Sequence, residues 1–164
     1  MWSMIPLLAL AAAPVSPSAV LESPTRHVRT AHPYVESLLR DGFQRSPTFA
    51  RLLVRLERSD LIVFIESQIP LPPGIEGRLV MLSATHGVRY VLIQIGTGDS
   101  LMDAIALLGH ELEHANEIAD AREVVDMSGF VALYERIGVK NGWHQYETKM
   151  AQEAGRQIRR ELLA

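Results

Sequence analysis

The chain has 164 residues, 48% of them hydrophobic and 21% charged, which is typical of one soluble globular domain with a core of its own. Its net charge of -3 gives no electrostatic reason to expect a nucleic acid or an anionic membrane as partner. The absence of cysteine excludes disulfides, thiolate zinc sites and cysteine nucleophiles, so any metal must be held by histidine and carboxylate.

The first 19 residues, MWSMIPLLALAAAPVSPSA, are typical of a leader. The apolar run from Met4 to about Ala13 is too short to cross a bilayer but suits a signal-peptide core, and the small residues up to Ala19 resemble a cleavage region. No Lys or Arg precedes the run. We therefore expect that an atypical signal directs the protein to the periplasm or to secretion. The alternative is a cytoplasmic protein with a disordered leader. We expect residues 20–164 to form one domain without an integral membrane segment. The sequence does not determine the oligomeric state.

The N-terminal half predicts two helices followed by three strands. Ser46 and Pro47 form an N-cap with proline at the first helical position, and apolar residues at helical spacing follow. The predicted helices span 33–44 and 47–59, and the predicted strands span 61–65, 78–83 and 89–95. A loop at 69–77 precedes the second strand, and a turn at 84–87 that includes Gly87 joins the last two. Three successive strands with a short last connection favour a small, largely antiparallel sheet.

The C-terminal half predicts helices only. Asp99 or Ser100 can cap a helix over 101–119. Residues 121–137 continue as helix, interrupted near Ser128 and Gly129 and ended by Gly138. A turn at Asn141 and Gly142 leads into a final helix over 143–163. The predicted fold class is α+β.

The predicted helix over 101–119 carries the sequence HELEH. His110 and His114 lie one turn apart on one helix face, close enough to hold one metal ion, and Glu111 lies next to that face. Gly109 would let another backbone approach the helix. Asp103 and Glu117 share the stripe of the histidines, so the alternative interpretation is a solvated helix face on an interaction module without metal.

Glu147 is the candidate third ligand. It lies within an apolar stripe of the predicted last helix, formed by Trp143, Met150, Ala154 and Ile158. A buried carboxylate is costly unless it is paired or bound to a metal, so the partner is a metal ion or a buried arginine. A catalytic zinc site needs three protein ligands and one open position.

His110, Glu111, His114 and Glu147, the last within YETKMAQEAG, resemble the zincin metallopeptidases of the gluzincin type over roughly residues 89–160. The resemblance implies a zincin-like fold, in which a small antiparallel sheet packs with the HExxH helix and a C-terminal helix. It also implies Zn2+ held by the two histidines and Glu147, and hydrolysis of a peptide or protein substrate with Glu111 as general base. The rival interpretation within a metal site is a structural zinc without turnover.

Asp120 is the competing third ligand. It lies where the metzincin-like pattern places its last ligand, and Met127 could then act as the methionine of the turn that follows in that pattern. The pattern needs glycine, however, where this chain has Glu117, a good helix former. We expect Glu117 to support a histidine from the second coordination shell. Peptide deformylases also carry HExxH but need a cysteine ligand.

The remaining candidates concern the substrate and the other histidines. The strand over 90–95, if it is an edge, would pair with an extended substrate. His144 and Tyr146 flank Glu147 and could stabilise an oxyanion, although ordinary packing suits them better. For His27, His32 and His86 we expect surface positions, because they lie in irregular sequence or in a turn.

Overall fold

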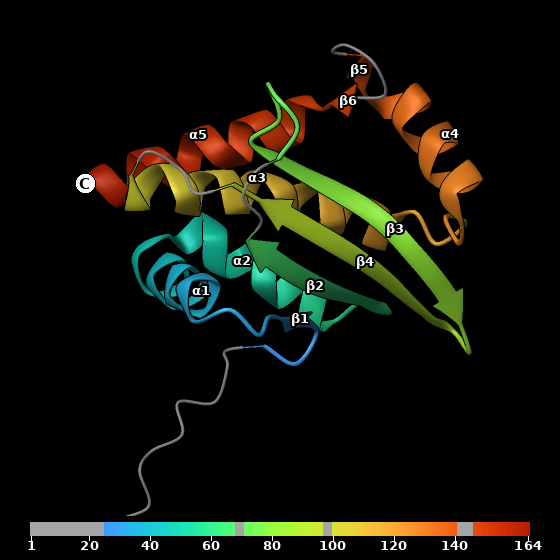
Figure 1. Ribbon diagram of the computed structural model, residues 1–164, viewed down its shortest axis with the longest axis horizontal. Coiled ribbons are helices and arrows are strands. Elements are labelled where there is room, and N and C mark those ends of the chain that lie inside the picture. The colour runs from blue at the N-terminus through green and yellow to red at the C-terminus, as the bar shows by residue number, and fades with distance from the viewer. Residues whose placement is uncertain (1–24, 68–70, 97–99, 141–145) are drawn as a thin grey trace, which may run out of the picture.

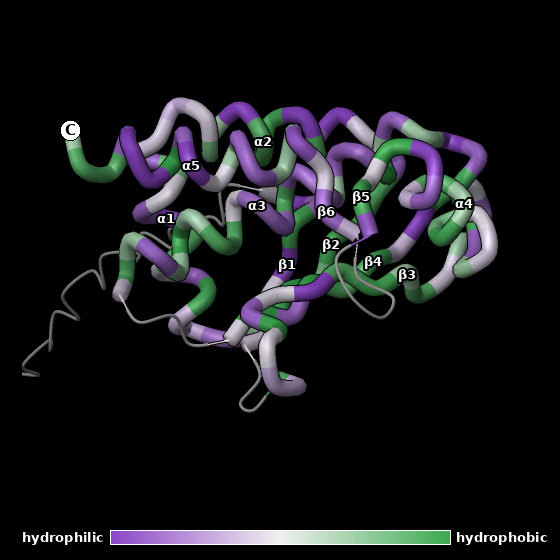
Figure 2. The backbone as a smooth tube through the Cα atoms, turned by 90° about the horizontal axis from the view of Figure 1, so that it is seen from above, coloured by the Kyte–Doolittle hydropathy of each residue, from purple (hydrophilic) through white to green (hydrophobic). Residues whose placement is uncertain are grey.

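The computed structural model describes residues 25–67, 71–96, 100–140 and 146–164, and its elements form two layers. Figure 1 shows a sheet facing the viewer with helices α3 and α5 above and behind it, and Figure 2 shows α2, α3 and α5 along one side and strands β2, β3 and β4 along the other. The mixed α+β class is therefore confirmed. The predicted leader over residues 1–19 lies outside the described residues.

Five helices are present in the described part of the chain: α1 (Pro33–Arg45), α2 (Pro47–Glu57), α3 (Leu101–Asp120), α4 (Met127–Ile137) and α5 (Lys149–Leu163). The main sheet contains β1 (Val28–Arg29), β2 (Leu61–Ser67), β3 (Gly77–Thr85) and β4 (Val88–Ile95). A separate two-stranded ladder is formed by β5 (Val139–Lys140) and β6 (Tyr146–Glu147). None of the described helices combines the length and the apolar character needed to cross a bilayer.

Side-chain caps explain where four of these helices begin. Ser46 accepts a hydrogen bond from the backbone N–H of Phe49 at the start of α2, and Ser100 caps α3 in the same way, as predicted. Asp126 caps α4 and Thr148 caps α5. The prediction of helix from residue 121 was wrong, because residues 121–126 form a turn and Asp126 then caps a new helix that begins at Met127.

The sheet is mixed, and the expectation of a largely antiparallel sheet was wrong. Its strand order is β1-β2-β4-β3, in which β1 and β4 run parallel to β2 and only β3 is antiparallel to its neighbour. The loop before β3 carries the chain past the position that β4 later fills, so β2 and β3 do not pair. The β3–β4 turn is as predicted, with positive φ at His86 (51°) and Gly87 (78°), the pair of values a two-residue hairpin requires.

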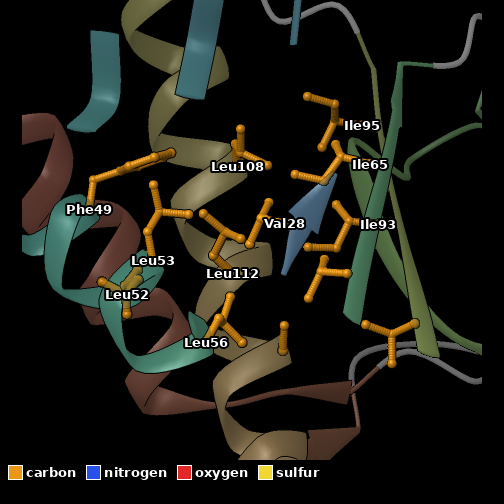
Figure 3. Close-up of a cluster of buried hydrophobic side chains, with 14 of the residues drawn as sticks. Val28, Phe49, Leu52, Leu53, Leu56, Ile65, Ile93, Ile95, Leu108 and Leu112 are labelled. Carbon is orange, nitrogen blue, oxygen red and sulfur yellow. The ribbon is translucent and has the colours of Figure 1, made fainter. Parts of the chain in front are cut away.

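The core lies between the sheet and helices α2 and α3. Figure 3 shows Ile65, Ile93 and Ile95 of the strands opposite Leu108 and Leu112 of α3. All five side chains are at most 1% exposed, and each contributes about 1.5–3 kcal/mol through burial. This packing fixes α3 against the sheet and so determines where the HELEH residues lie.

Arg89 of β4 faces the same side of the sheet as its apolar neighbours and is only 2% exposed. Its guanidinium group pairs with Asp60 and donates hydrogen bonds to the carbonyls of Ile118 and Ala119 in the last turn of α3. It also reaches two carbonyls of the segment after that helix. A buried cation thus satisfies the C-terminal carbonyls of α3, a favourable position in the field of the helix dipole.

Candidate metal centre

Helix α3 presents both histidines of HELEH at one place. The ring centroids of His110 and His114 are 4.9 Å apart and nearly perpendicular, as expected for residues one helical turn apart. Helix α5 packs closely beside them because Gly155 has no side chain, and a Cβ there would lie 3.5 Å from the Cβ of His110. The space beside Gly109 is filled by the side chain of Ile158 and not by a backbone, which corrects our expectation for that glycine.

Glu147 reaches this place from strand β6 and not from a helix. Helix α5 begins only at Lys149, after the Thr148 cap, and Met150 is 63% exposed. The prediction of an apolar helical stripe through Glu147 was therefore wrong, because the N-cap and the β5–β6 ladder hold this residue in extended backbone. Trp143 and the predicted turn at 141–142 lie outside the described residues.

The Glu147 carboxylate nevertheless faces the histidines. Its Oε1 atom lies 3.3 Å from Nε2 of His110, and one ligand atom each from His110, His114 and Glu147 lie within 4.8 Å of one another. A charge-assisted hydrogen bond is typically about 2.7–2.9 Å long. Two ligands on one tetrahedral zinc, with bonds of about 2.0–2.1 Å, are separated by roughly 3.4 Å. His110 and Glu147 therefore form a hydrogen-bonded pair whose spacing is close to that of two ligands on one ion, while the full cluster, up to 4.8 Å across, would have to close slightly around a metal.

The electrostatics of this pair favour opposite charges. Burial lowers the pKa of His110, but the hydrogen bond to Glu147 and the nearby Glu111 and Glu117 outweigh it, so the pKa is raised. The hydrogen bond with His110 lowers the pKa of Glu147 against the effect of burial. The pair therefore keeps the Glu147 carboxylate ionised, which is the form that binds a cation, and favours the protonated form of His110, which would have to lose its proton for a metal to bind.

His114 is oriented by groups behind it. Its Nδ1 atom donates to Oε2 of Glu117 at 2.8 Å, and the other oxygen of that carboxylate accepts from Thr148. This leaves Nε2 as the ring nitrogen that could act as a ligand, and it places Glu117 in contact with a histidine, as its predicted supporting role requires. The Tyr134 hydroxyl donates to the backbone carbonyl of His114 at 3.1 Å, and the edge of its ring meets the His114 ring. Burial raises the pKa of Tyr134 well above its ordinary value, so this hydroxyl stays a donor.

Glu111 is buried beside the ligand cluster and is not part of it. The residue is 5% exposed, and a Cβ on Gly77 of strand β3 would lie 2.6 Å from its Oε1 atom. Burial raises the pKa of Glu111, against the influence of His114 and His110. The absence of a side chain at Gly77 is what lets this carboxylate lie against the edge of the sheet, a contact that sequence reasoning missed.

Asp120 points away from the histidines. Its carboxylate pairs with Arg55 of α2 at 2.9 Å and its side chain is 73% exposed. The same arginine contacts Glu113, the charged residue between the histidines. Met127 is 49% exposed at the start of α4. Among the described residues, the metzincin-like alternative therefore lacks its third ligand.

The other predicted residues lie outside the cluster. His32 and His86 are exposed, as expected, but His27 is partly buried and its Nδ1 atom has no hydrogen-bond partner, which corrects the expectation of a surface position. The ring of Tyr146 stacks on that of Tyr134, with 6.3 Å between the ring centroids, so Tyr146 contributes to packing. His144 is outside the described residues.

The condition for substrate pairing by residues 90–95, that this strand be an edge, is not met. Strand β4 pairs with β2 on one side and with β3 on the other, and β3 is the edge beside Glu111.

No family model, curated protein or solved structure matches this chain.

Proposed function

We propose that this protein is a zinc-dependent peptide hydrolase of the zincin type, resembling the gluzincins. The observation that carries the proposal is that two glutamates lie near the histidines in different positions. Glu147 faces the two histidine rings as a ligand would, while Glu111 is buried beside them without belonging to the ligand set. A purely structural metal site has no task for that second carboxylate.

The donor set fits zinc. Two imidazole nitrogens and one carboxylate oxygen are the ligands of known catalytic zinc sites, and a three-residue set leaves one position open for a substrate or water. Held by His110, His114 and Glu147, a zinc ion would supply Lewis-acid chemistry toward the scissile carbonyl and the attacking water. Glu111 accepts the proton of the attacking water and returns it to the leaving amine, and Gly77 leaves the room that its carboxylate needs.

The fold agrees with this assignment in its main lines. The ligand-bearing helix α3 follows strand β4 of a small sheet, and the antiparallel edge strand β3 runs beside the proposed base. The departure from the gluzincin pattern is the origin of Glu147, which comes from the two-residue strand β6 just before helix α5.

The first test is metal binding by the full chain, purified without chelator. We expect about one zinc per chain, with binding abolished by His110→Ala or His114→Ala. Glu147→Ala should weaken binding by more than about 100-fold, since even loss of a supporting group behind a ligand costs about 10–100-fold. The matched control is Asp120→Ala, which removes a carboxylate bound to Arg55 and should leave zinc affinity unchanged.

The second test separates an enzyme from a structural zinc protein. Glu111→Gln should retain zinc while hydrolysis of a peptide library, followed by mass spectrometry, falls by about 100-fold or more. Stoichiometric zinc without any hydrolysis by the wild type would favour the structural role. A protein that takes up no added zinc would favour the metal-free interaction module.

A further inference from the structure

Thr148 connects the segment that carries Glu147 to the segment that carries the histidines. It is 4% exposed, and its Oγ1 atom makes two hydrogen bonds. The hydroxyl accepts from the backbone N–H of Ala151 at 3.1 Å, which caps helix α5, and it donates to Oε1 of Glu117 at 2.5 Å. Both the donor and an acceptor position of this single oxygen are therefore in use.

Glu117 carries this connection on to His114. One carboxylate oxygen accepts from Thr148 and the other accepts from Nδ1 of His114. Thr148 is also the residue directly after Glu147, so the position of its backbone determines where the Glu147 carboxylate begins. The Thr148 hydroxyl thus fixes the orientation of His114 through Glu117, and it fixes the position of Glu147 through the backbone.

We propose that Thr148 is a positioning residue that sets the metal affinity of this centre. It joins the start of α5 to the middle of α3, so that Glu147 and His114 are held for the same metal ion before the ion arrives. Pre-organised ligands lose less conformational freedom when the metal binds. The proposal rests on the proposed zinc site, but its structural part, the control of the His114 tautomer, can be measured without metal.

The variants separate positioning from helix capping. Thr148→Val keeps the shape and loses both hydrogen bonds, whereas Thr148→Ser keeps the hydroxyl. Thr148→Asp keeps the cap, because aspartate is a good N-cap residue, but it cannot donate to Glu117. Asp126→Ala is the matched control, since the Asp126 side chain caps α4 through the backbone N–H of Gly129 and makes no hydrogen bond to Glu117 or the histidines. The contact of α4 with His114 is made by Tyr134, two helical turns further along, which this variant retains.

The first measurement is the zinc affinity of each variant, determined by competition with a chromophoric chelator. Thr148→Val and Thr148→Asp should weaken binding by about 10–100-fold, the usual effect of removing support behind a ligand. Thr148→Ser should restore wild-type affinity, and Asp126→Ala should not change it. Adding Thr148→Val to Glu117→Gln should cause no further loss, because both changes break the same connection.

The second measurement is the tautomer of His114 in the metal-free protein, read from the nitrogen chemical shifts of its ring. The proton should be on Nδ1 in the wild type and in Thr148→Ser, and it should be shared between both nitrogens in Thr148→Val and Thr148→Asp. The proposal is overturned if this tautomer is the same in all four proteins, or if zinc binding weakens equally in Thr148→Val and Asp126→Ala. A wild type that binds no zinc overturns the proposed function, while the tautomer still decides the role of Thr148.

Discussion

Replacing Arg89 by methionine should be among the most damaging single changes in this chain. The guanidinium group makes six hydrogen bonds: two to the Asp60 carboxylate and four to the backbone carbonyls of Ile118, Ala119, Ala121 and Val124. Methionine fills a similar volume but removes one donor from each of these carbonyls at the end of α3, the helix that carries both histidines. The carbonyls of Ile118 and Ala121 keep the backbone N–H groups of Ala121 and Val124 as donors, so the loss falls mainly on Ala119, Val124 and Asp60.

The magnitude follows from the burial of these groups. Removing one partner of a buried ion pair costs about 3–5 kcal/mol, and each carbonyl left unsatisfied costs about 1–3 kcal/mol. These contributions overlap, and Asp60 is 38% exposed and can regain water, so we expect a loss of about 3–5 kcal/mol. A domain with a stability of about 5 kcal/mol, the lower end of the ordinary range, would be left close to unfolding.

The assay is urea unfolding followed by circular dichroism, with Arg136→Met as the matched control. Arg136 pairs with Glu123 where both side chains are more than 60% exposed, so its loss should cost at most about 1 kcal/mol. Arg89→Lys should be intermediate, because one ammonium group cannot reproduce the two-point contact with Asp60. If Arg89→Met were no more destabilising than Arg136→Met, the capping role of Arg89 would be refuted.

Two further predictions concern Glu161 and Gly77. Burial raises the pKa of Glu161, but hydrogen bonds from Ser46, Gln157 and Thr48 outweigh it and lower the pKa to about 2. Its stabilising effect is therefore complete above the unfolded pKa of 4.5 and is lost as the pH falls toward 2, so Glu161→Gln should cost about 1 kcal/mol at pH 7 and progressively less below pH 4.5 in parallel unfolding curves. An equal cost at every pH would contradict this account. Gly77→Ala should place a Cβ against the Glu111 carboxylate and reduce hydrolysis while zinc content stays at the wild-type level, with Ser83→Ala on the same strand as control. Loss of zinc in the Gly77 variant would show that the strand supports the ligands and not the base.

Local signals in the sequence predicted most of the helices and strands correctly. Ser46 and Pro47 determine the start of α2 through one hydrogen bond and one fixed backbone angle, both within three residues. His110 and His114 could be assigned to one face because helical spacing alone brings them together. The strand order could not be predicted in this way, because it depends on which strand fills the place beside β2 after the loop has passed it.

The non-local contacts of the site were predicted less well. Glu147 lies beside His110 as expected, but the argument that selected it assumed a helix that begins six residues too early. The cap at Thr148 was the available signal, since threonine before a helical run is a common N-cap. Arg89 was also missed, although its alternation with Val91 and Ile93 places it on the core side of β4.

Helix α5 has a consequence for the order in which the protein folds. Its Glu161 holds Ser46, 115 residues away in the chain, and Arg45 donates to the carbonyl of Leu162 over 117 residues. Contacts between such distant residues pay a large entropy cost and form late, after the sheet and α3 have brought their surroundings together. Because Glu147 directly precedes α5, a growing chain that ends at α4 carries both histidines without the third carboxylate. The proposed metal ion would therefore favour only the final docking of α5 during refolding, and we expect the sheet to form at the same rate with or without it.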